Sequence, residues 1–155
     1  MEHKNKMDKK KVKRSDFTYY KLIDLNNDGV KELLLATDRS VLWDNRVLLL
    51  TYYNGKVLPL ICFEGAGARG RQLINKNTLI LANSGSDFSS QIYLSVVKGK
   101  LKILQQTYRQ NMKKGYPPQY LYKVNNKKVS ESIYQKAIDK YGLSIAKQIE
   151  FKRVW

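Results

Sequence analysis

The stretch Arg46-Val-Leu-Leu-Leu-Thr-Tyr-Tyr-Asn-Gly-Lys-Val-Leu-Pro-Leu-Ile-Cys-Phe63 places two runs of strand-forming residues on either side of Asn54-Gly55. Asn-Gly is the strongest short-range hairpin signal, because both central residues of a type I′ turn need a positive φ. The sequence therefore predicts an antiparallel hairpin made of Arg46–Tyr53 and Lys56–Phe63.

Short strand-like segments bounded by turn residues recur on both sides of this hairpin. Before it, Phe17–Leu25 and Val30–Thr37 flank the polar stretch Asn26–Gly29. After it come Thr78–Ala82, Ser90–Val97, Lys100–Tyr108, Tyr120–Val124 and Lys127–Val129. Strands that follow one another about every ten residues indicate antiparallel, meander-like sheets rather than parallel βαβ units.

The C-terminal region has a different periodicity. Ser130 is a good helix N-cap and Gly142 a good stop. Between them, one helical face collects the apolar residues Ile133, Tyr134, Ala137, Ile138 and Tyr141. A period of two at Ile149, Phe151 and Trp155 then predicts a last strand. The expected fold class is α+β and mainly β, with antiparallel meander-like sheets and one C-terminal amphipathic helix.

The chain has 155 residues, of which 43% are hydrophobic and 27% charged, which is typical of a globular protein. Residues 1–14 hold seven bases and two acids, so we expect a basic, disordered tail. Residues 15–155 are then a single β-rich domain. The longest apolar run, Val57–Phe63, is strand-sized and contains Pro59, so we expect no membrane span.

The formal net charge of +16 indicates attraction to polyanions such as nucleic acid, anionic lipid or an acidic cell-wall polymer. The alternative to a selected anion-binding surface is that the abundance of lysine reflects coding bias and solubility. The candidate anion-binding residues are Arg69, Arg71, Lys113 and Lys114.

Histidine and cysteine are too rare for the common catalytic constellations. His3 is the only histidine and lies in the tail, which argues against Ser-His-Asp and Cys-His chemistry. Cys62, the only cysteine, lies in an apolar run, so we expect a small buried hydrophobe and no intrachain disulfide. We therefore expect a protein that is not an enzyme.

The segment Asp24-Leu-Asn-Asn-Asp-Gly-Val-Lys-Glu32 concentrates oxygen ligands within a basic chain. The side chains of Asp24, Asn26, Asp28 and Glu32 and the carbonyl of Val30 can converge on a hard cation, and the glycine between them permits a sharp bend. Calcium fits best, because it accepts six to eight oxygens in flexible geometry. We expect such an ion to be structural.

A tight turn without an ion is the alternative, since Asn-Asn-Asp-Gly also suits a bare hairpin. A turn alone does not account for Glu32, nor for Asp24 beside Asp28 at the end of an apolar strand. Position twelve of the loop is Leu35 rather than Glu, which argues against a helix-loop-helix calcium sensor.

The stretch Tyr19-Tyr-Lys-Leu-Ile-Asp-Leu-Asn-Asn-Asp-Gly-Val-Lys-Glu-Leu-Leu34 resembles the calcium loop of FG-GAP and VCBS repeats, D-x-D/N-x-D-G-x-x-D/E between two strands. The remainder resembles domains of unknown function in secreted bacterial lipoproteins, with a late Tyr-rich strand and a Val-Ser step, as in Leu121–Ser130. The resemblance implies calcium ligands at Asp24, Asn26, Asp28 and Glu32, and an extracellular or cell-surface location.

The sequence holds two further patterns that resemble binding motifs. Gly65-Ala-Gly-Ala-Arg-Gly70 matches G-x-G-x-x-G, but the interval before the next expected strand is too short for the crossover helix of a dinucleotide site. Tyrosines near bases favour stacking on nucleic-acid bases or sugars, although tyrosine is equally a strand former. This set comprises Tyr108, Tyr116, Tyr120 and Tyr122 with Arg109, Lys113, Lys114 and Lys123.

The leading hypothesis is a non-catalytic, extracytoplasmic calcium-binding domain whose basic face meets an anionic polymer or cell-wall component. The alternative is an intracellular nucleic-acid-binding protein, because the N-terminus lacks the apolar stretch of an export signal. A carboxylate-based glycan hydrolase ranks third, with isolated acids at Asp38, Asp44, Glu64 and Asp87. Oligomeric state is left open by the sequence.

Overall fold

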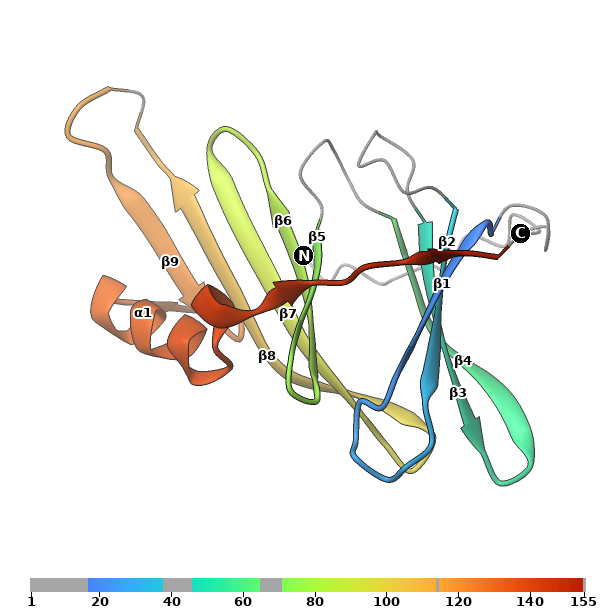
Figure 1. Ribbon diagram of the computed structural model, residues 1–155. Coiled ribbons are helices and arrows are strands. Elements are labelled where there is room, and N and C mark those ends of the chain that lie inside the picture. The colour runs from blue at the N-terminus through green and yellow to red at the C-terminus, as the bar shows by residue number, and fades with distance from the viewer. Residues whose placement is uncertain (1–16, 38–45, 65–70, 114, 155) are drawn as a thin grey trace.

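Two antiparallel β-sheets make up most of the computed structural model, which describes residues 17–37, 46–64, 71–113 and 115–154 (Figure 1). The predicted tail, residues 1–14, lies outside these ranges. The mainly β, α+β class expected from the sequence is confirmed, as are its meander-like connections.

The first sheet has five strands in the order β12-β1-β2-β3-β4, and four of them follow one another along the chain. Their bounds are β1 Tyr19–Ile23, β2 Glu32–Ala36, β3 Arg46–Tyr53, β4 Lys56–Glu64 and β12 Lys152–Arg153.

The second sheet has seven strands in the order β10-β9-β8-β7-β6-β5-β11. Their bounds are β5 Arg71–Asn75, β6 Thr78–Ser84, β7 Phe88–Val97, β8 Lys100–Asn111, β9 Tyr120–Val124, β10 Lys127–Val129 and β11 Lys147–Gln148.

The predicted hairpin turns are confirmed by backbone geometry. Two-residue turns with positive φ at both positions match the right-handed twist of the strands that they join. They occur at Asn54-Gly55 (φ 49° and 76°), Lys98-Gly99 (48° and 70°) and Asn125-Asn126 (49° and 64°).

The predicted helix is α1, Glu131–Lys140, and the short 3₁₀ helix η2, Leu143–Ile145, follows it. The Ser130 hydroxyl accepts a hydrogen bond from the N–H of Ile133 at 3.4 Å, and Gly142 ends the helix with a φ of 65°. Ile133 was expected on the buried face but is exposed, whereas Tyr134 and Ala137 are buried.

Within the described ranges, the structure holds no helix with the length and apolar character needed to cross a bilayer.

The main core lies between the two sheets. Each sheet turns one apolar face inward, and the alternation of buried residues along β2 and β3 follows the period of two of a strand. The buried members of this core are Leu25, Leu34, Ala36, Val47, Leu49, Leu79, Leu94, Val96 and Ile149.

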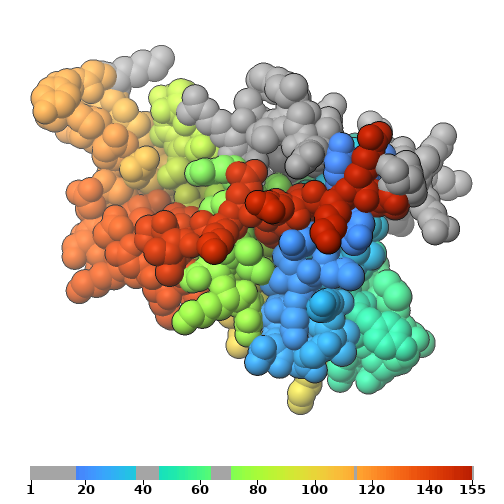
Figure 2. Space-filling view, in the orientation of Figure 1, coloured from blue at the N-terminus to red at the C-terminus, as the bar shows by residue number. Residues whose placement is uncertain are grey.

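The C-terminal segment differs from the single strand that we expected. β11 pairs with β5 at the edge of the second sheet, and β12 pairs with β1 at the edge of the first. Ile149, between the two short strands, is buried in the main core, and its N–H donates to the Gln72 carbonyl at 3.0 Å. The segment therefore crosses from one sheet to the other (Figures 1 and 2).

A smaller core lies on the other face of the second sheet, beneath α1 and η2. Tyr93 is its largest buried side chain, and its ring lies 5.2 Å from that of Tyr141. Within the described residues, the Tyr93 hydroxyl has no hydrogen-bond partner. Burial raises the pKa of Tyr93 to about 12; nearby Thr107 opposes the rise, and the charges of Tyr134 and Asp139 add to it.

We predict an alkaline loss of stability that depends on this hydroxyl. Because the pKa of Tyr93 is raised to about 12 in the folded state and is about 10 when unfolded, its contribution is complete below pH 10 and is lost as pH rises towards 12. Tyr93→Phe is expected to retain more stability than the parent over this interval, in urea denaturation at a series of pH values. Tyr116→Phe, at an exposed position, is the control, and identical profiles for all three proteins would contradict the assignment.

Candidate functional site

The acidic loop, residues 24–31, connects β1 to β2 and is organised by the Asp24 carboxylate. This carboxylate accepts hydrogen bonds from the backbone N–H groups of Asn26 (3.4 Å), Asp28 (3.3 Å) and Gly29 (2.9 Å). Asn27 and Gly29 have positive φ values of 58° and 85°, so the chain bends sharply around Asp24.

Asn26 and Asp28 complete the cluster. The Asn26 amide donates to Asp28 Oδ2 at 2.7 Å, and its Oδ1 accepts the Asp28 N–H at 3.1 Å. Asp28 Oδ1 accepts the N–H of Val30 at 2.8 Å. The structure thus brings together three of the predicted ligand side chains and places Val30 directly beside them.

The electrostatics of the loop favour a charged Asp24. Desolvation raises the pKa of this carboxyl, but hydrogen bonds from the loop's backbone N–H groups, that of Gly29 first, outweigh it and hold the pKa below its ordinary value. Such a carboxylate stabilises the folded loop above about pH 4, and the effect is lost as pH falls below that range.

Glu32, the fourth predicted ligand side chain, has hydrogen-bond partners of its own. Its side chain is 1% exposed; Oε2 accepts the Leu25 N–H at 2.8 Å, and Oε1 accepts the Thr51 hydroxyl at 3.0 Å. The carboxylate therefore closes the base of the acidic loop and joins it to β3.

Leu25 anchors the loop in the main core. Its side chain is fully buried, and its carbonyl accepts a hydrogen bond from the Ser95 hydroxyl of β7 at 3.1 Å. One residue of the acidic loop is thereby attached to both sheets. The neighbours Asp24 and Asn26 are held at the surface as a result.

As a metal site, the loop offers two carboxylates and one amide. Each carboxylate oxygen can take part in more than one interaction, so lone pairs remain for a cation beside the backbone N–H groups. A metal site built only from His, Cys, Asp or Glu needs at least three such side chains close together. The described residues contain no such group. Asn26 is the third side chain here, and oxygen ligands of this mixed kind suit calcium better than zinc.

The predicted anion-binding residues do not form one described site. Arg69 and Lys114 lie outside the described residues. Arg71 is exposed at the start of β5, and Lys113 is exposed after the end of β8. β5, Arg71–Asn75, is not among the strands expected from the sequence. It begins directly after residue 70, which leaves no room there for the crossover helix of a dinucleotide site.

Four of the aromatic and basic residues near β8 and β9 form a continuous cluster. The Arg109 guanidinium carbon lies 5.1 Å from the centre of the Tyr120 ring. Ring centres are 6.0 Å apart for Tyr120 and Tyr122, and 5.1 Å apart for Tyr122 and Tyr134. We name this set, Arg109, Tyr120, Tyr122 and Tyr134, the aromatic cluster; it was predicted only in part, because Tyr134 was assigned to the helix core alone.

The other members of the predicted stacking set lie elsewhere. Tyr108 is on the opposite face of β8, where its ring stacks on Phe88 with centres 6.4 Å apart. Lys123 is directly opposite Tyr108 in the β8–β9 pairing, and Tyr116 lies exposed beyond the strands. Within the aromatic cluster, burial and then the neighbouring Glu131 raise the pKa of Tyr122.

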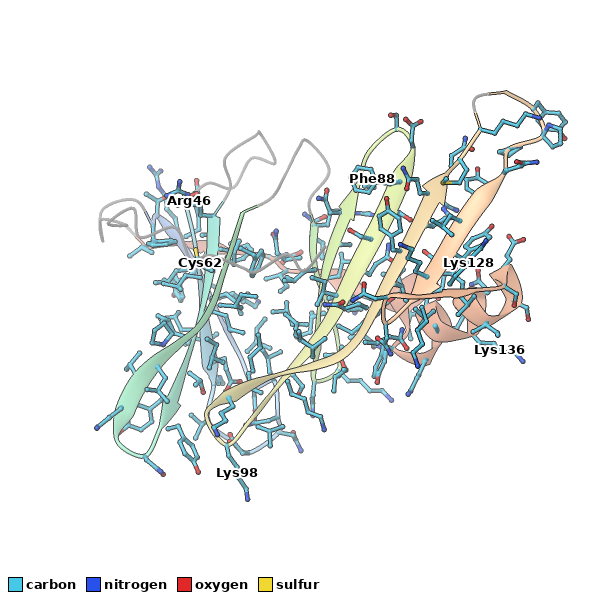
Figure 3. The ribbon with its side chains drawn as sticks, turned by 180° about the vertical axis from the view of Figure 1, so that it is seen from behind. Arg46, Cys62, Phe88, Lys98, Lys128 and Lys136 are labelled. Carbon is cyan, nitrogen blue, oxygen red and sulfur yellow. The ribbon has the colours of Figure 1, made fainter. Side chains whose placement is uncertain are left out.

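Exposed lysines occur on the elements that hold the aromatic cluster or lie next to them. They are Lys113, Lys127, Lys128, Lys136 and Lys140, from the ends of β8, from β10 and from α1. Lys128 and Lys136 both lie at this end of the second sheet (Figure 3). We call Arg109, Lys113, Lys127, Lys136 and Lys140 the basic face; Lys128 pairs with Lys123 and so lies on the other side of the sheet. The acids Glu131 and Asp139 lie on the same helix as Lys136 and Lys140.

A separate hollow of about 450 Å³ lies where the C-terminal segment crosses between the sheets. Its charged lining residues are Lys21, Lys147 and Glu150. A single carboxylate does not supply the acid pair that a glycan hydrolase of the usual kind needs.

Comparison with protein-family models, with curated proteins and with solved structures found no match to this chain.

The position of Glu32 predicts a stability effect that needs no ion. Glu32→Ala leaves the buried Leu25 N–H without its acceptor and opens a cavity, and we expect a loss of about 3 kcal/mol in the free energy of unfolding. Glu32→Gln keeps an acceptor oxygen and should cost about 1 kcal/mol or less. Urea denaturation measures both, with exposed Lys31→Ala as the control. A loss below about 0.5 kcal/mol for Glu32→Ala would overturn the structural role of this carboxylate.

Proposed function

We propose that the protein is a non-catalytic calcium-binding domain of the cell exterior or cell surface, with a basic face that meets anionic polymers. The observation that carries the proposal is the convergence of Asp24, Asn26 and Asp28 in a loop whose base is fixed by Leu25. A pre-formed loop lowers the ordering cost of binding an ion.

The proposed ligands are the side chains of Asp24, Asn26 and Asp28 and the carbonyl of Val30. Glu32 was included by the loop pattern, and its two oxygens already accept hydrogen bonds from the Leu25 N–H and the Thr51 hydroxyl. Water molecules then complete the coordination that calcium requires. The ion offsets the mutual repulsion of two carboxylates, so its role is structural.

The net charge of +16 and the basic face support the polymer half of the proposal. Binding through such a surface releases counterions and therefore weakens as salt rises. The charge alone does not distinguish an acidic cell-wall polymer from a nucleic acid, so the calcium site and the polymer surface need separate tests.

The calcium site is tested by titrating calcium into the chelator-treated full chain, followed by calorimetry and by thermal unfolding. We expect stabilisation of about 2.7 kcal/mol at a calcium concentration a hundred times Kd. A Kd of about 10⁻⁴ to 10⁻³ M would fit an extracellular module.

The matched variants are Asp28→Asn and Asp139→Asn. The first removes a charge from the acidic loop and keeps the oxygen that accepts the Val30 N–H; the second removes an exposed charge from α1. Calcium should stabilise the Asp139→Asn protein as it does the parent, and the Asp28→Asn protein much less. Absence of heat and of stabilisation in the parent would leave the loop as a hydrogen-bonded turn.

A second candidate function is single-stranded nucleic-acid binding, which the aromatic cluster favours. Tyr120 is 41% exposed and lies beside a guanidinium, a combination that stacks bases and pairs with phosphates. Inorganic polyphosphate has the charge of nucleic acid without rings, so it separates charge attraction from stacking.

We predict that Tyr120→Ala weakens binding of the full chain to oligo-uridine about tenfold and leaves binding to polyphosphate unchanged, because stacking is worth about 1–3 kcal/mol per base. Arg109→Gln should lower the salt dependence of both by about one unit of slope. Tyr116→Ala, at an exposed position outside the cluster, is the control. Equal affinity of Tyr120→Ala and parent for oligo-uridine would remove the stacking role, and polyphosphate binding alone would favour the leading proposal.

A further inference from the structure

Three turns gather at one end of the molecule, the lower end in both Figure 1 and Figure 3. They are the acidic loop at residues 24–31, the β3–β4 turn at residues 52–57 and the β7–β8 turn at residues 97–100. We call these residues the three-turn end.

Specific contacts hold these turns together. A Cβ at Gly99 would lie 2.7 Å from Cγ of Tyr53, so only glycine lets the β7–β8 turn approach the β3–β4 turn so closely. The Ser95 hydroxyl, on the strand leading into the β7–β8 turn, bonds to the Leu25 carbonyl of the acidic loop. The three-turn end is therefore one surface rather than three independent loops.

Each turn exposes apolar or aromatic surface. Tyr52 and Val57 are opposite each other in the β3–β4 pairing and are 53% and 64% exposed. Val97 of the β7–β8 turn is 45% exposed, and Val30 of the acidic loop is also exposed. Burying these groups away from water is favourable, and none of them packs in either described core.

Lysines flank the same apolar groups. Lys31, Lys56, Lys98 and Lys100 are all exposed, and they outnumber the acids Asp24 and Asp28. Figure 3 shows Lys98 at the tip of its turn, pointing away from the sheets. A long lysine side chain can keep its ammonium at a charged surface while a neighbouring apolar group enters a less polar layer.

We propose that the three-turn end docks on the surface of an anionic lipid bilayer. We choose this partner because its charge is complementary to that of the three-turn end. The lysines match the negative headgroups of an anionic bilayer, and the apolar tips between them match the apolar layer beneath the headgroups. Tyrosine suits the boundary between these layers because its ring is apolar and its hydroxyl polar. A surface made of projecting turn tips fits a deformable interface better than the flat, close-packed contact of a stable protein complex. The inference does not depend on calcium binding or on the basic face.

The test is co-sedimentation of the full chain with vesicles of phosphatidylcholine alone and of phosphatidylcholine mixed with phosphatidylserine. We expect binding to the mixed vesicles only. Lys98→Gln with Lys100→Gln should weaken it about 25-fold, since each lysine near an anionic surface contributes about fivefold. Tyr52→Ser with Val57→Ser should weaken it at least tenfold at unchanged charge, by exposing less apolar area for burial.

Matched controls remove the same groups elsewhere. Lys147→Gln with Lys152→Gln removes two exposed charges from β11 and β12, outside both the three-turn end and the basic face, and Ile133→Ser with Ile145→Ser removes two exposed apolar side chains. Both should bind the mixed vesicles as the parent does. We call the double variants at Lys98 and Lys100 and at Tyr52 and Val57 the tip variants. Equal losses of vesicle binding in the tip variants and in the controls, or no binding by the parent, would overturn the proposal.

Repeating the assay with chelator and with calcium separates this inference from the proposed function. Tip-dependent binding that persists in chelator supports the lipid surface whatever the calcium titration shows. Binding that appears only with calcium and is insensitive to the two tip variants would overturn it and point to an ion bridge through the acidic loop instead.

Discussion

Mutual burial of the apolar faces of two sheets is the constraint on which the other features depend. Leu34 and Leu49 of the first sheet meet Leu79 and Leu94 of the second, and neither sheet covers its own apolar face. The shared core explains why the C-terminal segment pairs with an edge strand of each sheet: Ile149 is drawn into the core, so the residues on either side of it lie over different edges.

The acidic loop is positioned by the same burial. Leu25 enters the core, and its backbone is fixed by an acceptor, Glu32, and a donor, Ser95, which belong to different sheets. The partly buried residues on either side of Leu25, Asp24 and Asn26, make their hydrogen bonds within the loop. A loop anchored in this way keeps its side-chain oxygens together at lower entropic cost than a free hairpin tip does.

The hairpins were predictable because their turn chemistry is local. Asn54-Gly55 specifies its turn whatever surrounds it, whereas β5 has only Leu73 and Ile74 as apolar residues and exists because β6 and β11 pair with it. The burial of Glu32 was also readable from the sequence. Glu32 is two residues before Leu34 in β2, so both side chains point to the same, buried side of the strand. The loop pattern, however, assigns the Glu32 carboxylate to the ion. The partners Leu25 and Thr51 are visible only once the strands are paired.

The geometry of the aromatic cluster limits how it can contribute to binding. Arg109 lies over the Tyr120 ring, and Tyr122 is packed between Tyr120 and Tyr134 of the helix, so Tyr120 is the most exposed ring of the set. A single open ring, partly covered by a guanidinium, stacks one base or sugar rather than a run of them. We therefore expect weak sequence selection by stacking, and in the proposed polymer binding most of the energy would come from the lysines. The same reasoning supports the proposal of polyanions as a class of partner: the charge is spread over several elements, while the capacity for stacking contacts is confined to one position.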